Sequence, residues 1–257
     1  MPVACRTIAA MTDQVKVALG IGAGDAIGAA FARRFAKGGY RVAMARRDPA
    51  KSDALVQEIN AAGGIAKAYA ADARQEDSLE ALFDAVESDL GAVEVVLYNA
   101  GANYKSPLTE TTQDMFRKVW ALGCEGGFLS GKAAAKRMLP RGKGTILFTG
   151  ATASMRGGAG FAAFAAAKFG LRAVAQSMAR ELGPEGIHVA HLIVDGGVDS
   201  PAIHARRKAA NGGKDINFPP DSLMDLASIA EAYWTLSQQG RDAWTHELDI
   251  RPFVETW

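Results

Sequence analysis

The stretch VKVALGIGAGDAIG, residues 15–28, decides the fold class of this chain. Its first six residues are largely apolar and predict a buried strand. Three glycines follow at Gly22, Gly24 and Gly28, and apolar residues at helical spacing begin at about Ala26. A strand that passes through glycines into a helix can hold a pyrophosphate against the positive end of that helix. The stretch therefore predicts the first unit of a dinucleotide-binding sheet, with a tight structural turn as the alternative.

Short apolar runs alternate with helical patterns along the rest of the chain. We expect further strands at residues 40–45, 65–70, 93–98, 145–149, 188–194 and 244–250. We expect helices at residues 26–37, 49–62, 76–90, 112–138, 161–182 and 222–238, with Asp48 as the cap of the second. Nearly continuous apolar strands joined by helices are typical of a parallel sheet covered on both faces. The expected fold class is α/β, a single Rossmann-type doubly wound parallel sheet of about seven strands.

The same pattern predicts how the chain is organised. Residues 1–12 are expected to be a flexible N-terminal extension, because Met11 is a second candidate start, and residues 13–257 to be one domain. Residues 195–221 are rich in glycine, proline and charge, so we expect one long irregular loop there. Long loops in compact domains are usually functional, and ligands of such sheets bind outside the carboxyl ends of the strands.

Composition argues against several classes of function. The chain of 257 residues carries 29 basic and 28 acidic residues without a long block of like charge, so neither nucleic acid nor a membrane surface is expected as a partner. No apolar run is long enough to span a membrane and the first residues make a poor signal peptide, so we expect a cytoplasmic protein. The two cysteines and four histidines lack the spacing of a disulfide framework or a metal site, so no metal is expected.

The residues after the expected second strand bear on the choice of cofactor. A carboxylate at this place would bind the ribose hydroxyls of NAD, but the chain has Arg46 and Arg47. A guanidinium can hold a 2′-phosphate through two hydrogen bonds, so we predict NADP as the cofactor, with NAD as the alternative. Two alternatives oppose this prediction: both arginines are simply solvated, or Asp25 faces the same region and repels a phosphate.

The chain resembles the short-chain dehydrogenase/reductase family over about residues 13–252. The glycine loop of the family matches residues 21–28, its Asn-Ala-Gly turn matches residues 99–101, and the segment that lies by the nicotinamide is similar to residues 195–200. The resemblance implies a set of cofactor-binding residues. They are Gly22, Gly24, Ile27, Gly28, Arg46, Arg47, Asp72, Ala73, Asn99, Ala100, Gly101, Lys168, Val198 and Ser200.

The catalytic set that the resemblance implies is incomplete in this sequence. The family uses a tyrosine as proton donor, a lysine four residues later, a serine and a helical asparagine. Lys168 is present, but the tyrosine, serine and asparagine positions fall on Phe164, Ala151 and about Gly123. No tyrosine occurs between residues 105 and 232, so the usual proton relay cannot operate.

Two further residues are therefore candidates for catalysis. Thr152, beside Ala151, offers a hydroxyl that can hydrogen-bond a substrate oxygen, although its high pKa makes it a poor acid. Lys168 is expected to contact the nicotinamide ribose and can also serve as a proton source, because burial lowers a lysine pKa. Tyr98, Tyr104 and His204 are further candidates for the same role.

Two functions remain open from the sequence. One is an oxidoreductase of the short-chain type with a non-standard site, which transfers hydride to or from a small apolar carbonyl or enoyl substrate. The other is a noncatalytic nucleotide-binding protein that acts as a sensor or partner subunit. In both, the resemblance implies a homodimer or homotetramer that associates through the alanine-rich helix at residues 161–182 and the helix before it.

Overall fold

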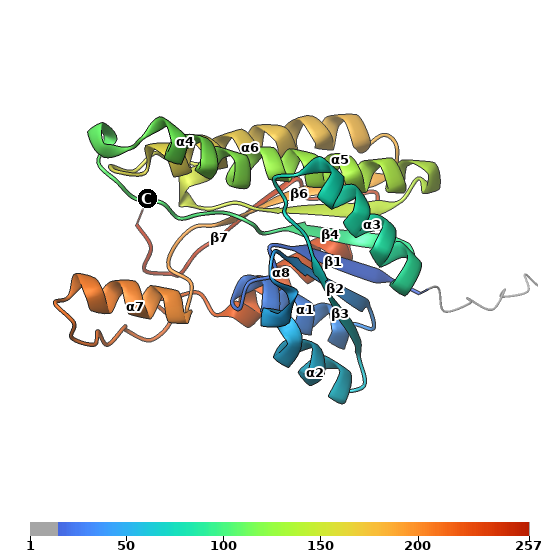
Figure 1. Cartoon of the computed structure of the whole chain (residues 1–257), viewed down its shortest axis with the longest axis horizontal. Helices are drawn as coiled ribbons and strands as arrows, with labels where there is room; N and C mark the ends of the chain where they lie inside the picture. The colour runs from blue at the N-terminus through green and yellow to red at the C-terminus, as the bar shows by residue number, and fades with distance from the viewer. Residues whose placement is uncertain (1–14, 257) are drawn as a thin grey trace, which may run out of the picture.

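Seven parallel strands form one sheet in the order β3-β2-β1-β4-β5-β6-β7, as the computed structural model shows for residues 15–256 (Figure 1). The strands are β1 Val17–Ile21, β2 Arg41–Arg46, β3 Ile65–Ala70, β4 Val93–Tyr98, β5 Gly144–Thr149, β6 Ile187–Val194 and β7 Glu247–Ile250. The chain builds β1 to β3 outward and then crosses back to β4 on the other side of β1, which is the switch point where such sheets bind ligands. The extension expected at residues 1–12 lies outside the described residues.

Helices cover both faces of the sheet, so the predicted doubly wound α/β fold is confirmed (Figure 1). They are α1 Ile27–Lys37, α2 Asp53–Ala61, α3 Glu76–Leu90, α4 Gln113–Trp120, α5 Gly126–Met138, α6 Ala162–Leu182, α7 Pro201–Ala210 and α8 Leu226–Ser237. The buried residues of α3, α5 and α6 share one apolar core with the sheet, and those of α1, α2 and α8 share the other.

The two cores follow from the alternation of side chains along each strand. In β1, Val17, Leu19 and Ile21 enter the core under α3, α5 and α6, whereas Ala18 enters the opposite core. Both faces are apolar, which explains the continuous apolar runs in the sequence. Each large side chain buried in this way contributes about 1.5–3 kcal/mol to the free energy of unfolding. The sheet is therefore a stable support for the loops at its carboxyl edge.

The helix expected over residues 112–138 is interrupted by a π-helical turn at Ala121–Glu125. The Tyr98 hydroxyl donates a hydrogen bond to the backbone carbonyl of Leu122 within that turn. Glycines make room for the tyrosine, because a Cβ placed at Gly126 would lie only 2.4 Å from the Tyr98 hydroxyl oxygen. A buried side chain from a distant strand thus fixes the irregularity, which helical periodicity could not reveal.

The prediction of an irregular segment over residues 195–221 is wrong for Pro201–Ala210, which form α7, whereas residues 195–200 and 211–221 form no helix or strand. Proline in the first turn and several alanines favour a helix there. The helix was missed because only Ile203 of its residues is buried, so no apolar stripe marks it. Figure 1 shows α7, in orange, standing away from the sheet.

The prediction of a helix that begins after an Asp48 cap was also wrong in detail. Residues Pro49–Ser52 form a 3₁₀ turn and α2 begins at Asp53. The Asp48 side chain makes no capping hydrogen bond and instead lies 3.7 Å from the Lys51 ammonium.

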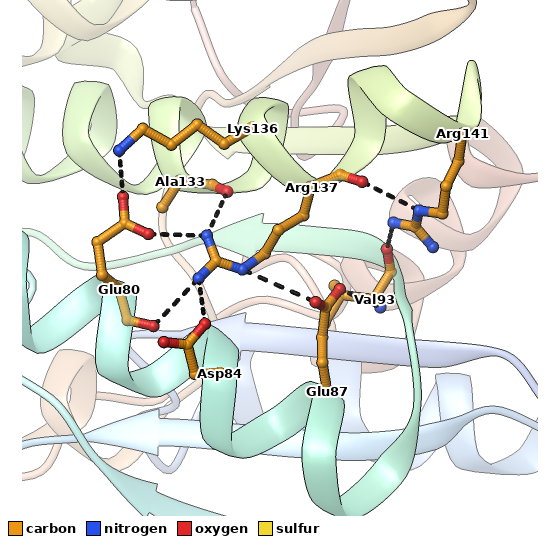
Figure 2. A network of polar contacts seen from close by, with 8 residues as sticks. All are labelled: Glu80, Asp84, Glu87, Val93, Ala133, Lys136, Arg137 and Arg141. Carbon is orange, nitrogen blue, oxygen red and sulfur yellow. Dashed lines mark hydrogen bonds and ion pairs between the residues drawn. The ribbon is translucent and has the colours of Figure 1, made fainter.

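Arg137 on α5 joins that helix to α3 through several carboxylates (Figure 2). Its guanidinium lies 2.8 Å from Glu80 Oε2, 2.6 Å from Asp84 Oδ1 and 3.8 Å from Glu87 Oε2. The Arg137 side chain is only 15% exposed, so solvent screens these ion pairs less than it screens ordinary surface pairs. The network holds together α3 and α5, two of the helices that cover this face of the sheet.

Candidate active site

The carboxyl ends of β1 to β4 open onto a cavity of about 480 Å³, which we call the strand-end cavity. It is lined by Ile21, Gly22, Gly24, Ala45, Arg46, Arg47, Asp48, Lys51, Ala71, Asp72, Ala73, Asn99, Ala100, Gly101 and Leu122. The structure thus brings most of the predicted cofactor residues together at the switch point of the sheet. Of the others, Ile27, Gly28, Lys168, Val198 and Ser200 lie outside this lining.

The glycine loop and the turn after β4 together form the floor of the strand-end cavity. Asn99 Nδ2 donates to the Gly22 carbonyl over 3.2 Å, and the Asn99 backbone N–H donates to the Ile21 carbonyl. Gly22 has φ +80°, and a Cβ there would lie 2.5 Å from the Ala100 nitrogen, so only glycine fits. A Cβ at Gly24 would meet nothing within 4 Å, so this part of the loop leaves open space for a ligand.

Ile27 and Gly28 hold the loop rather than line the cavity. Ile27 is the first residue of α1, the helix whose N-terminal end follows the glycine loop. A Cβ at Gly28 would lie 2.7 Å from Ala23 Cα, so glycine permits the close approach of helix and loop. The fit of the residues to a dinucleotide rests on this backbone approach and on the open space at Gly24.

The two arginines at the cavity differ in their partners. Arg46 Nη1 donates to Asp25 Oδ1 over 2.9 Å, so Asp25 is paired with Arg46. Within residues 15–256, Arg47 has neither a hydrogen bond nor an ion pair, and its positive charge helps to lower the pKa of Asp72. Arg47 is therefore the guanidinium whose donors are open to an anion in the strand-end cavity.

Asp72 is occupied by a neighbouring arginine. Arg74 Nε donates to Asp72 Oδ1 over 2.9 Å, and this hydrogen bond is the largest cause of an Asp72 pKa lowered to about 2. The carboxylate stays ionised, and both of its oxygens accept hydrogen bonds from Arg74. A cofactor group that contacts this residue would have to use the remaining acceptor positions or the backbone.

Lys168 on α6 is buried beside the strand-end cavity. Its ammonium donates to the Thr149 carbonyl over 2.7 Å, and only 4% of the residue is exposed. Burial lowers the pKa of Lys168 to about 8, because the charged form loses its hydration. A Cβ at Gly101 would lie 3.4 Å from Lys168 Nζ, which places the ammonium next to the cavity floor.

One side of Lys168 is apolar. The Phe164 ring centroid lies 6.0 Å from Lys168 Nζ, and Phe164 packs against Phe161. A Cβ at Gly123 would lie 2.8 Å from Ala167 Cβ, so α6 already fills the space that a larger side chain would need. The structure thus builds an apolar wall beside the lysine.

Thr152 begins the 3₁₀ turn Thr152–Ser154 that follows β5, and its hydroxyl donates to Asp195 Oδ1 over 2.6 Å. Asp195 is completely buried. Its carboxylate also accepts hydrogen bonds from Arg156, whose Nη1 and Nη2 lie 3.1 and 3.2 Å from the carboxylate oxygens. Sequence reasoning missed this polar cluster. A charged residue directly after the buried strand β6 was the signal that could have found it.

The remaining predicted residues do not meet at one point. Val198 forms a bridge with Met224, and the Ser200 hydroxyl donates to the Val198 carbonyl at the start of α7. Tyr98 is fully buried, and desolvation raises its pKa far above the ordinary value. His204 bonds to Asp199 over 2.7 Å on the exposed side of α7.

Residues 16–211 match the sequence profile described as short chain dehydrogenase. This chain belongs to the short-chain dehydrogenase family. Membership makes it an oxidoreductase of the dehydrogenase and reductase class. Among residues 15–256 no group of His, Cys, Asp or Glu side chains could hold a metal ion, and no helix is long and apolar enough to cross a membrane.

Individual relatives support the assignment. The chain is 35% identical over 192 residues to a short-chain dehydrogenase/reductase of Armillaria gallica, which covers 74% of this chain and 73% of that protein. A short-chain dehydrogenase structure from Rhodopseudomonas palustris is 48% identical, with a TM-score of 0.79 over 93% of this chain and 99% of that one. An actinorhodin polyketide ketoreductase solved with NADPH is 25% identical, with a TM-score of 0.84 over 93% and 96% of the two chains.

Proposed function

We propose that this short-chain dehydrogenase binds NADP(H) and transfers hydride to or from a small apolar carbonyl or enoyl substrate at a non-standard site. The observation that carries the proposal is the strand-end cavity, where the glycine loop, the Asn99 turn and an unpaired Arg47 meet. When bound, the nicotinamide supplies or accepts the hydride, and the protein provides position and electrostatics.

The preference for a 2′-phosphate rests on Arg47. Because Asp25 is paired with Arg46, its carboxylate is neutralised and leaves Arg47 free to bind an anion. The related ketoreductase was solved with NADPH, which supports the same choice here. A guanidinium that gains a phosphate forms a charge-assisted pair, so Arg47 would favour NADP over NAD.

The reacting half of the site would rely on Lys168. Its position beside Gly101 suits a contact with the nicotinamide ribose, and its pKa of about 8 lets it hold or release a proton near neutral pH. With Phe164 and Ala151 at the positions of the family's tyrosine and serine, the usual donors are replaced by apolar groups. Loss of a general acid costs about 10²–10⁴ in rate, so slow turnover is expected. The same apolar wall favours an apolar substrate.

A second function is favoured by the same apolar wall. Phe164 and Ala151 place apolar groups at two positions of the usual proton relay, and the position at Gly123 has no room for a larger side chain. The cofactor residues, in contrast, are retained. A noncatalytic nucleotide-binding protein, acting as a sensor or a partner subunit, would have this combination. The two functions differ in turnover and agree in cofactor binding.

We further propose a homodimer or homotetramer. Four large apolar side chains are exposed on α4, α5 and α6, which form one layer of the molecule: Phe116, Trp120, Phe128 and Phe169 are 38–44% exposed. Burial of such a patch by a second copy is favourable, and isologous packing is the usual arrangement. Light scattering of the purified chain tests this, and a monomer would contradict it.

Parallel fluorescence titrations with NADPH and NADH test the main proposal. We expect tighter binding of NADPH, and we expect Arg47→Met to weaken NADPH binding by roughly 10-fold or more while NADH binding stays unchanged. Arg207→Met, on the exposed face of α7, is the matched control. Equal affinity for both nucleotides would refute the role of Arg47. A panel of aldehydes, ketones and activated alkenes with NADPH then separates an enzyme from a sensor.

A further inference from the structure

A second, smaller cavity adjoins the strand-end cavity, and we call it the side cavity. Its volume is about 200 Å³, and it is lined by Arg47, Arg74, Ala102, Met115, Lys118, Val119 and Leu122. Arg47 and Leu122 line both cavities, so the two spaces lie next to each other. The glycine loop lines the strand-end cavity and contributes nothing to the side cavity. The side cavity is therefore a separate space beside the nucleotide site.

One wall of the side cavity is a stripe along α4 and the π turn that follows it. Met115, Lys118, Val119 and Leu122 are spaced three, four and seven residues apart, which puts them on one side of a helix. Thr112 caps this helix, because its side chain accepts a hydrogen bond from the Met115 backbone nitrogen. The helix therefore holds the stripe in place against the loops that follow β3 and β4.

The floor of the side cavity is apolar. Val119 is buried, and the partly buried Ala102 and Met115 pack against the same small apolar cluster. An apolar cavity of about 150 Å³ is large enough to hold a benzene ring. The side cavity, at about 200 Å³, has room for one aromatic ring with a small substituent. The thioether of Met115 also favours an aromatic neighbour.

The mouth of the side cavity carries three cationic side chains, and two of them have carboxylate partners. Arg74 donates hydrogen bonds to both oxygens of Asp72, and Lys118 Nζ lies 2.7 Å from Asp114 Oδ2. Arg47 is exposed and has no hydrogen bond or ion pair with any residue from 15 to 256. The uncompensated charge at this mouth is therefore the Arg47 guanidinium, whose planar fork suits a carboxylate.

We propose that the side cavity binds a small aromatic carboxylate, with its ring against Met115 and Val119 and its carboxylate on Arg47. Because Arg47 lines both cavities, this ligand competes for the guanidinium with the 2′-phosphate of NADP(H). The ligand is then a regulator that weakens the binding of NADP(H) and leaves the binding of NAD(H) unchanged. This coupling rests on the role of Arg47 in the proposed function, whereas the site itself does not depend on that role.

Sodium benzoate is the probe that tests the site in the full-length protein without nucleotide. Saturation-transfer NMR of the ligand measures its binding, and we expect a Kd on the order of 1 mM for a ligand of this size. Benzamide has the same ring without the charge, and acetate has the charge without the ring. Both should bind at least about 10-fold more weakly, because each lacks one of the two contacts. Absence of benzoate binding would overturn the proposal.

Three substitutions locate the bound benzoate. Ala102→Leu and Met115→Trp fill the side cavity from two different elements, and Arg47→Met removes the charge. Each should weaken benzoate binding by at least about 10-fold. Arg207→Met, on the exposed side of α7, is the control that should bind like the wild type. Thermal unfolding shows which variants fold, and either filling variant decides alone. A folded filling variant that binds benzoate as tightly as the wild type would overturn the location.

The two nucleotides separate this proposal from the proposed function. Saturation with NADH should leave benzoate binding unchanged, whereas saturation with NADPH should weaken it by at least about 5-fold. Loss of benzoate binding in the presence of NADH would show that the adenine fills the side cavity, and it would overturn the proposal. Equal affinity for NADPH and NADH, with benzoate binding still dependent on Arg47, would refute the proposed preference for NADP and leave the aromatic carboxylate site standing.

Discussion

Replacement of Lys168 by methionine should stabilise the protein near neutral pH. The pKa of Lys168 is lowered by burial from 10.5 to about 8, so the folded state disfavours the charged ammonium. At about 1.36 kcal/mol per pKa unit, the charge costs roughly 3 kcal/mol of folding free energy below pH 8. Methionine removes this cost but also the hydrogen bond to Thr149, which is worth about 1–2 kcal/mol. The net gain is about 1–2 kcal/mol, or roughly 4 °C in Tm for a chain of this size.

The sign of the pH dependence follows from the same shift. Between pH 8 and 10.5 the unfolded state binds more protons at Lys168 than the folded state, so wild-type stability rises with pH in this window through this group. The variant has no such group, so its advantage in Tm should shrink as the pH rises from 7 to 9.5. Thermal unfolding at both pH values measures this, with Lys37→Met on the surface as the control. A variant that melts below the wild type at pH 7, or an advantage that is constant with pH, would refute the reasoning.

Three further substitutions follow from the geometry. Gly22→Ala should abolish NADPH binding in a fluorescence titration, because its Cβ would lie 2.5 Å from the Ala100 nitrogen at φ +80°. Gly123→Asn should destabilise the protein by about 1–3 kcal/mol in chemical unfolding, because α6 approaches to 2.8 Å at Ala167; an unchanged free energy of unfolding would contradict it. Arg137→Met should lower the free energy of unfolding by about 1–2 kcal/mol, because it removes the guanidinium that three carboxylates share. An unchanged Tm would show that the network adds no stability.

The strands were predictable because both faces of this sheet are buried. Residues 93–98 form a strand with the expected bounds, since their buried apolar run and the turn residues around them leave little choice. Residues 65–70 also have the expected bounds, although β3 lies at the edge of the sheet and alternates between buried and exposed residues. The expected cofactor residues at the ends of β1, β2, β3 and β4 also meet at one cavity, because the carboxyl ends of parallel strands share an edge.

Other features depend on contacts that local patterns do not contain. Helix α7 was missed because it has almost no buried face. The π turn at Ala121–Glu125 depends on a hydrogen bond from Tyr98, more than twenty residues earlier in the chain. The polar cluster at Asp195 gathers donors from residues 152, 156 and 251, so no single stretch of sequence announces it.

Two buried charges argue that the site is in use. Lys168 and Asp195 are 4% and 0% exposed, and each charge weakens the fold unless its partners compensate fully. A chain that needed this fold for assembly alone would gain stability from apolar residues at both positions. The apolar wall at Phe164 shows that the same helix accommodates an apolar ring four residues before the lysine. Lys168 contacts the end of β5 and Asp195 follows β6, on the carboxyl edge of the sheet that also carries the strand-end cavity. We therefore attribute the cost of the two charges to chemistry or ligand binding at that edge.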